Sequence, residues 1–111
     1  MNDISKKDIS KKKELLCKHM SEILPALRTS LQLSQTELGE YVSVSRQTIS
    51  EIERGEYHMS WNQFASFYMV FSSNKASHEV LEDNGLSIHD IAPAILVTKC
   101  KDTEEENNQV G

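Results

Sequence analysis

The stretch SQTELGEYVSVSRQTISEIER, residues 34–54, decides the fold that this chain adopts. It predicts two short helices, each opened by a serine. Ser34 has Glu37 three residues later, which is the spacing of a capping box, and Ser45 opens the second helix. Apolar residues at helical spacing give both helices a buried side, formed by Leu38, Val42, Ile49 and Ile52. Because only two residues join the helices, we expect them to cross steeply.

A steep crossing of two short helices is a helix-turn-helix arrangement, and its second helix is the part suited to read DNA. Such a helix enters the major groove, where residues near its N-terminus meet base edges. Its expected outward side carries Arg46, Gln47, Ser50, Glu51 and Arg54. Arginine can fork onto guanine, glutamine onto adenine, and a carboxylate can accept from cytosine. The alternatives are a solvated helix face for Arg46 and Gln47, and an ion pair with a neighbouring cation for Glu51.

The same residues resemble a known family. SQTEL at 34–38, VSRQTIS at 44–50 and IERG at 52–55 look like the lambda-repressor/Cro-type helix-turn-helix of the Xre family. With Arg28 before them and an aromatic helix after them, the resemblance covers roughly residues 24–71. It implies an all-α, five- to six-helix lambda-repressor-like DNA-binding domain whose partner is double-stranded DNA.

The resemblance also implies roles for individual residues. Gln35 stands where the family contacts a phosphate and steadies the reading helix, and Arg54 stands where a phosphate contact is common. Arg28 and Glu53 match a buried ion pair that ties the first helix to the third. The base-facing positions of the family are occupied by Ser45, Arg46, Gln47, Ser50 and Glu51.

Two positions depart from the family pattern. Ser43 stands in the turn where glycine is usual, and a serine in a left-handed conformation costs about 1 kcal/mol. Gly39 stands where the family prefers alanine, at about 1 kcal/mol of helix propensity. A small residue is retained at that position, so we expect a slightly altered turn and an intact helix pair.

The rest of the chain divides by composition. Residues 1–13 are lysine-rich and predict a basic flexible arm, either solvated or following DNA phosphates. Residues 14–73 form the predicted DNA-binding domain, in which Pro25 either kinks the first helix or begins a new one. Residues 74–98 predict further helices, and the acidic residues 99–111 predict a disordered tail. Five apolar residues complete the core or form a dimer interface: Leu86, Ile88, Ile91, Ile95 and Leu96.

Length and charge narrow the possible classes of protein. The chain has 111 residues and a formal net charge of −5, which suits one small domain. No apolar run is long enough to span a membrane, and the first residues lack the apolar core of a secretory signal. Two distant cysteines give no disulfide framework, so we expect a reducing cytoplasm. The acidic balance argues mildly against nucleic acid, and it predicts weak non-specific binding with a shallow salt dependence.

Residues for catalysis or for a cofactor are not apparent in the sequence. The four histidines have no metal-ligand spacing with Cys17 or Cys100. Ser87, His89 and Asp90 lie close together, but no nucleophile elbow precedes them. We therefore expect no enzyme, no metal site and no cofactor.

The sequence thus predicts a sequence-specific transcriptional regulator, a repressor. One helix-turn-helix reads only a half-site, so we expect a homodimer on a palindromic operator. The alternative is an antitoxin that binds a toxin protein through its C-terminal half and regulates its own promoter. A toxin reading frame beside the gene, or a second protein that co-purifies, would favour the alternative.

Overall fold

The computed structural model describes residues 6–94 of the chain, and this part is built from helices. A further helical stretch covers 88–94, and no strand occurs within the described range. The all-α expectation is therefore confirmed. The named helices are α1 (Lys6–Ser30), α2 (Gln35–Val42), α3 (Arg46–Glu53), α4 (Trp61–Ser72) and α5 (Lys75–Asp83).

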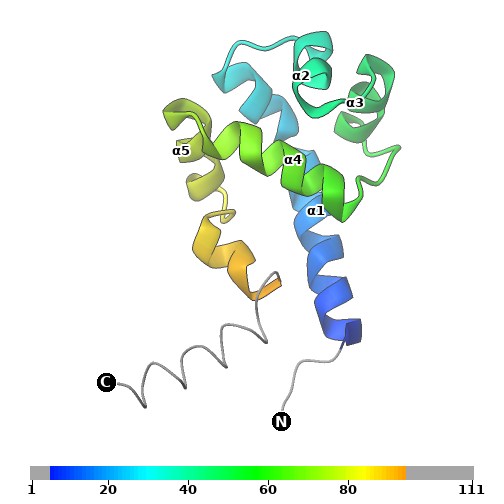
Figure 1. The fold of residues 1–111 in the computed structure, drawn as a ribbon, viewed down its shortest axis with the longest axis vertical. Coiled ribbons are helices and arrows are strands. Elements are labelled where there is room, and N and C mark those ends of the chain that lie inside the picture. Colours follow the sequence, from blue (N-terminus) through cyan, green and yellow to red (C-terminus); the bar gives the residue numbers. More distant parts are fainter. Residues whose placement is uncertain (1–5, 95–111) are drawn as a thin grey trace.

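The long helix α1 is the spine on which the other helices pack. It contacts α3, α4 and α5, while α2 contacts α3 and α4. Figure 1 shows α2 and α3 together at one end of the long axis, and the N-terminal half of α1 at the other end. The core between these ends is aliphatic on α1 and aromatic on α4. Its fully buried large side chains include Met20, Leu24, Leu27, Leu38, Ile49, Ile52, Phe64, Phe67, Phe71 and Leu81.

The serine caps predicted from the sequence start α2, α3 and α4. The Ser34 hydroxyl accepts from the Glu37 amide at 3.0 Å, and the Glu37 carboxylate accepts from the Ser34 amide at 2.8 Å. Ser60 and Gln63 repeat this reciprocal pair at the start of α4. Because each capping box satisfies two backbone groups that the helix itself leaves unpaired, these local sequences fix where the helices begin.

The expectation of a flexible arm over residues 1–13 is wrong from Lys6 onward, because Lys6 is the first residue of α1. Lysine is a good helix former, and adding turns to an existing helix costs little. Pro25 lies inside α1 and begins no new helix. Residues 1–5 lie outside the described part of the chain.

The region after α5 contributes to the core. Leu86 and Ile91 are buried, whereas the Ile88 side chain is 57% exposed. Ser87 and Asp90 bond each other's backbone amides, which caps the helical stretch that follows. The sequence left open whether the apolar residues of this region complete the core or form a dimer interface. Leu86 and Ile91 complete the core. Ile95, Leu96 and the tail predicted at 99–111 lie outside the described residues.

The turn between α2 and α3 has the left-handed residue that the sequence suggested. Ser43 has φ 58° and ψ 46°, and its amide bonds the Gly39 carbonyl oxygen. The carbonyl oxygen of Val44 lies 2.2 Å from the place where a Cβ on residue 39 would sit. The backbone of the turn therefore passes so close to α2 that only glycine fits at this position.

Substitutions at Ser43 and Gly39 should change the free energy of unfolding in opposite directions. Ser43→Gly should raise the free energy of unfolding by about 1 kcal/mol, because glycine adopts the left-handed conformation without strain. Gly39→Ala should lower it by about 1–3 kcal/mol despite alanine's better helix propensity, because the added Cβ meets backbone. Urea unfolding followed by circular dichroism measures both changes. A stabilising Gly39→Ala would contradict the close approach of the turn.

Candidate nucleic-acid interface

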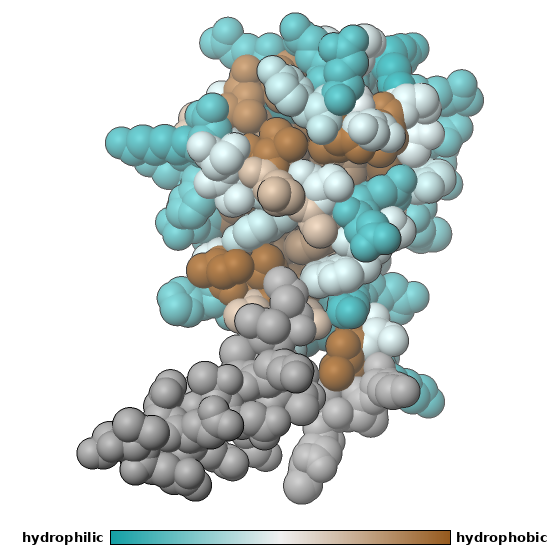
Figure 2. Space-filling view, viewed as in Figure 1, coloured by the Kyte–Doolittle hydropathy of each residue, from teal (hydrophilic) through white to brown (hydrophobic). Residues whose placement is uncertain are grey.

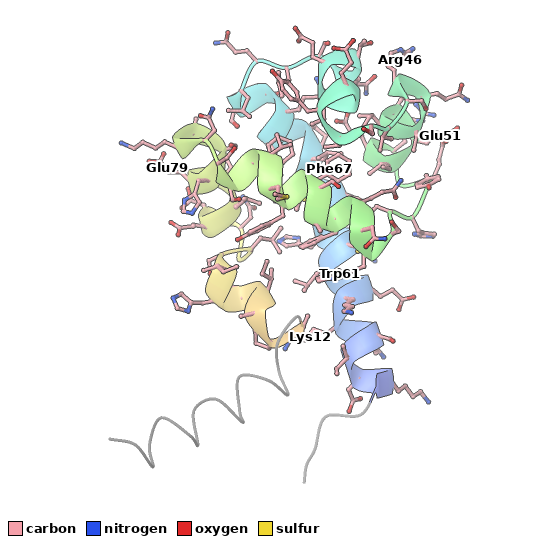
Figure 3. All side chains as sticks on the ribbon, viewed as in Figure 1. Lys12, Arg46, Glu51, Trp61, Phe67 and Glu79 are labelled. Carbon is pink, nitrogen blue, oxygen red and sulfur yellow. The ribbon has the colours of Figure 1, made fainter. Side chains whose placement is uncertain are left out.

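The helix α3 presents the polar side chains that the sequence assigned to base reading. Its apolar residues Ile49 and Ile52 are fully buried against the core. Figure 3 shows Arg46 and Glu51 directed away from the bundle. Of the assigned residues, Ser45, Arg46, Gln47 and Arg54 are exposed, and Ser50 and Glu51 are half-buried. Because one side of α3 is anchored in the core, the polar side forms a rigid, outward-facing surface.

Ser45 and Thr48 form the N-terminal cap of α3. The Ser45 hydroxyl oxygen accepts from the Thr48 amide at 3.1 Å and donates to the Thr48 hydroxyl at 2.9 Å. The cap therefore accounts for Ser45 without any base contact, although its side chain remains exposed. A base contact by Ser45 stays a prediction.

Polar residues along α3 hold one another in place. Gln47 donates from Nε2 to Glu51 Oε2 at 3.3 Å. The two residues are four positions apart, so their side chains lie one helical turn from each other on the same face of α3. The described side-chain hydrogen bond of Glu51 is thus with an amide, while its negative charge also contributes to raising the pKa of Arg54. Arg54 donates to the hydroxyl of Ser50.

Just beyond α3, Arg54 also forms an ion pair with a carboxylate that the sequence reasoning had not assigned. Arg54 Nη2 lies 3.0 Å from Glu56 Oε1. The hydrogen bond to this guanidinium lowers the pKa of Glu56, and the same bond raises the pKa of Arg54. Both groups are fully exposed, so salt screens their attraction strongly. A phosphate that binds Arg54 would have to compete with Glu56.

The ion pair implied by the family resemblance is present. Arg28 Nε lies 2.9 Å from Glu53 Oε2, and Arg28 Nη2 lies 3.2 Å from Glu53 Oε1, so the pair is bidentate. Arg28 Nη1 also donates to the Leu33 carbonyl at 3.0 Å. The two side chains are only 21% and 9% exposed, respectively. The pair therefore joins α1 to the end of α3 with little solvent screening.

Gln35 connects this ion pair to the outer surface. Its Nε2 donates to Glu53 Oε1 at 3.0 Å, and its Oε1 accepts from Arg46 Nη1 at 3.4 Å. A continuous polar network thus runs from Arg28 through Glu53 and Gln35 to Arg46. Sequence reasoning had given Gln35 and Arg46 separate roles and missed this link. Its partners lie 11 and 18 residues from Gln35, so no local pattern signals it.

The lysines near the N-terminus of α1 do not belong to this surface. Figure 3 shows Lys12 on the lower half of α1 and Arg46 at the opposite end of the long axis. Figure 2 shows mainly hydrophilic side chains around the rim of the upper end, where α2 and α3 lie. Lys18, in the middle of α1, instead lines a hollow together with Glu53 and Arg54.

Comparison with known proteins agrees with this geometry. A family model for the helix-turn-helix matches residues 26–60, which include the ion pair, the network and all of α2 and α3. Residues 26–60 are a helix-turn-helix of the lambda-repressor/Cro type. This helix-turn-helix makes the chain a DNA-binding protein of the transcription-regulator class. No curated protein and no solved structure matches the chain significantly.

Residues 6–94 contain no group of three or more His, Cys, Asp or Glu side chains placed to hold a metal ion. None of the described helices is both long enough and apolar enough to cross a membrane.

Proposed function

We propose that this protein is a repressor that binds a palindromic operator as a homodimer and reads each half-site with α3. The observation that carries the proposal is the network from Arg28 to Arg46, because it fixes an exposed arginine at the first residue of α3. A side chain that is already positioned loses less conformational entropy when it binds. The proposed role is binding alone, without catalysis.

The base-reading residues in this proposal are Arg46 and Gln47, with Ser45, Ser50 and Glu51 beside them. The paired amide of Gln47 and carboxylate of Glu51 present donor and acceptor groups in a fixed relation, as recognition of base edges requires. Gln35 and Arg54 flank this set and are the proposed phosphate contacts.

The homodimer follows from the small size of the reading surface. The helix α3 has eight residues and offers contacts to one half-site only. A single module of this size buries too little surface for tight, specific binding, and two copies on one duplex double the contacts. A palindromic operator is the sequence that two identical copies related by a two-fold axis would read.

Selection of bound sequences from a random duplex pool tests the operator. We expect a palindrome whose half-site centres lie about one helical turn apart, roughly 10 base pairs. Analytical ultracentrifugation on the selected duplex should then show two copies per site. A non-palindromic site occupied by one copy would contradict the proposal. A second protein that co-purifies and holds the chain off the operator would favour the antitoxin alternative.

The salt dependence of operator binding provides a separate check. Arg46 and Arg54 are the two cations per copy on the helix-turn-helix segment after α1. With about 0.9 counterion released per neutralised phosphate, a dimer should give a log–log slope no steeper than about −4. A much steeper slope, together with tight binding to random duplex, would show that further cations meet the DNA.

A further inference from the structure

A groove lies beside the N-terminal half of α1, outside the polar surface of α3. It has a volume of about 790 Å³ and runs between the N-terminal half of α1 and the start of α4. Figure 3 places Trp61 beside α1, where α4 begins. The apolar part of the groove's lining is formed by Leu15, Cys17, Met59 and Trp61. The Leu15 side chain, on the rim of the groove, is 60% exposed.

Lysines surround this apolar surface. Lys7, Lys11, Lys13 and Lys18 line the groove, with Glu14 as the carboxylate among them. Lys13 Nζ lies 5.3 Å from the centre of the Trp61 ring, as in a cation–π contact. The described residues provide no carboxylate within ion-pair distance of these four lysines. The groove therefore combines an apolar floor with a lining of net positive charge.

The thiol in this groove is not a reactive group at neutral pH. Burial, and secondarily the charge of Glu14, raises the pKa of Cys17 to about 11. Cys17 therefore contributes apolar surface to the floor, and the chemistry of the groove comes from the lysines and Trp61.

The chain itself contains a segment that matches the groove in composition. After Ala94 the sequence continues with the apolar run Ile95-Leu96-Val97, then with Lys99 and Lys101, and then with the acidic residues Asp102 and Glu104–Glu106, so residues 95–106 are acidic on balance. The last described helix ends at the same end of the long axis as the N-terminal half of α1 (Figure 1). Glu104 follows Ala94 by ten residues, which can span up to roughly 33 Å when extended. The segment therefore starts at the same end of the molecule as the groove and has this length of chain with which to reach it.

We propose that this groove binds the chain's own C-terminal segment, residues 95–106. The apolar run covers Leu15 and Trp61, and the four carboxylates lie against the lysines of α1. The segment thereby neutralises a cationic surface that would otherwise attract duplex DNA at the wrong end of the molecule. The acidic tail then lowers non-specific binding while the reading surface of α3 stays free.

Trp61 is the one tryptophan of the chain, so its fluorescence reports on the groove directly. In the full-length protein, we expect E104Q/E105Q/E106Q to increase acrylamide quenching of Trp61 and to shift its emission to longer wavelength. A matched control is E79Q/D83N, which removes two exposed carboxylates from α5. Acrylamide should quench the Trp61 fluorescence of this control to the same extent as that of the wild-type protein. Salt at about 1 M, where the Debye length falls to about 3 Å, should open the wild-type groove in the same way.

A charge exchange separates direct contact from an indirect effect. K7E/K11E should expose Trp61 as the tail variant does, and adding E104K/E105K to it should restore the protection. Lys13 is left unchanged because it touches the Trp61 ring. The tail variant should also bind random duplex more tightly, with a steeper salt dependence.

Three results would overturn the proposal. Equal quenching in the wild-type protein and E104Q/E105Q/E106Q would show that the tail does not cover the groove. Protection that grows with protein concentration would assign the groove to the tail of a second copy. Failure of the charge exchange to restore protection would show that the lysines do not contact the tail. None of these readouts requires an operator, so they remain distinct from the proposed repressor function.

Discussion

Replacing Arg46 and Gln47 together by alanine should abolish specific binding to the selected operator while leaving the fold intact. Each bidentate contact with a base is worth about 1–3 kcal/mol, so losing both should weaken binding by about 100-fold or more. Both side chains are exposed, and neither packs in the core. Fluorescence anisotropy with labelled operator measures the affinity, and circular dichroism measures the helical content.

A matched control for this variant is N62A/K75A. It also removes one exposed amide and one exposed cation, but from the first turns of α4 and α5. We expect its operator affinity to equal that of the wild-type protein. Unchanged affinity in R46A/Q47A would overturn the assignment of α3 as the reading helix. A loss of helical signal would mean that the two residues support the fold instead of recognition.

Removing Arg28 should destabilise the fold more than any change on the reading surface. In Arg28→Met, the Glu53 carboxylate, which is only 9% exposed, keeps the bond from Gln35 but loses its bidentate partner. Breaking such a pair on one side costs about 3–5 kcal/mol, which for a domain of this size lowers the melting temperature by roughly 12–40 °C. Thermal and urea unfolding followed by circular dichroism measure the loss.

A double-mutant cycle isolates the ion pair from the two side chains. R28M/E53M should be less destabilised than the sum of the single variants, because it leaves no buried charge without a partner. Arg54→Met is the control, since its ion pair with Glu56 is fully exposed and should leave the unfolding midpoint unchanged. A midpoint for Arg28→Met equal to that of Arg54→Met would show that the pair contributes nothing to stability.

The positions of the charged residues explain how a protein of acidic composition can bind DNA. Lys12 on α1 and Arg46 on α3 lie at opposite ends of the long axis, so these two cations cannot act on one short stretch of DNA as a single surface (Figure 3). Operator binding then depends on base contacts and on dimerisation more than on bulk charge. A net charge of −5 is compatible with DNA binding on these terms.

Much of the fold was predictable because its signals are local. The capping serines at 34, 45 and 60 bond backbone amides three residues away, and the buried positions repeat at helical spacing. The left-handed Ser43 was expected from the family resemblance, in which glycine is usual at this turn position. The arm over 1–13 was mispredicted from Lys6 onward, because a lysine-rich sequence fits solvent equally well as a coil or as a helix.

The sequence by itself determined where α2, α3 and α4 begin and which of their sides is buried, because those features depend on hydrogen bonds and periodicities within a few residues. Only the tertiary structure decided that Gln35 joins Glu53 to Arg46, that Leu86 and Ile91 complete the core, and that Lys12 lies at the opposite end of the molecule from Arg46. These relations join segments far apart in the chain, and their distances are set by how the helices pack around Phe64 and Phe67.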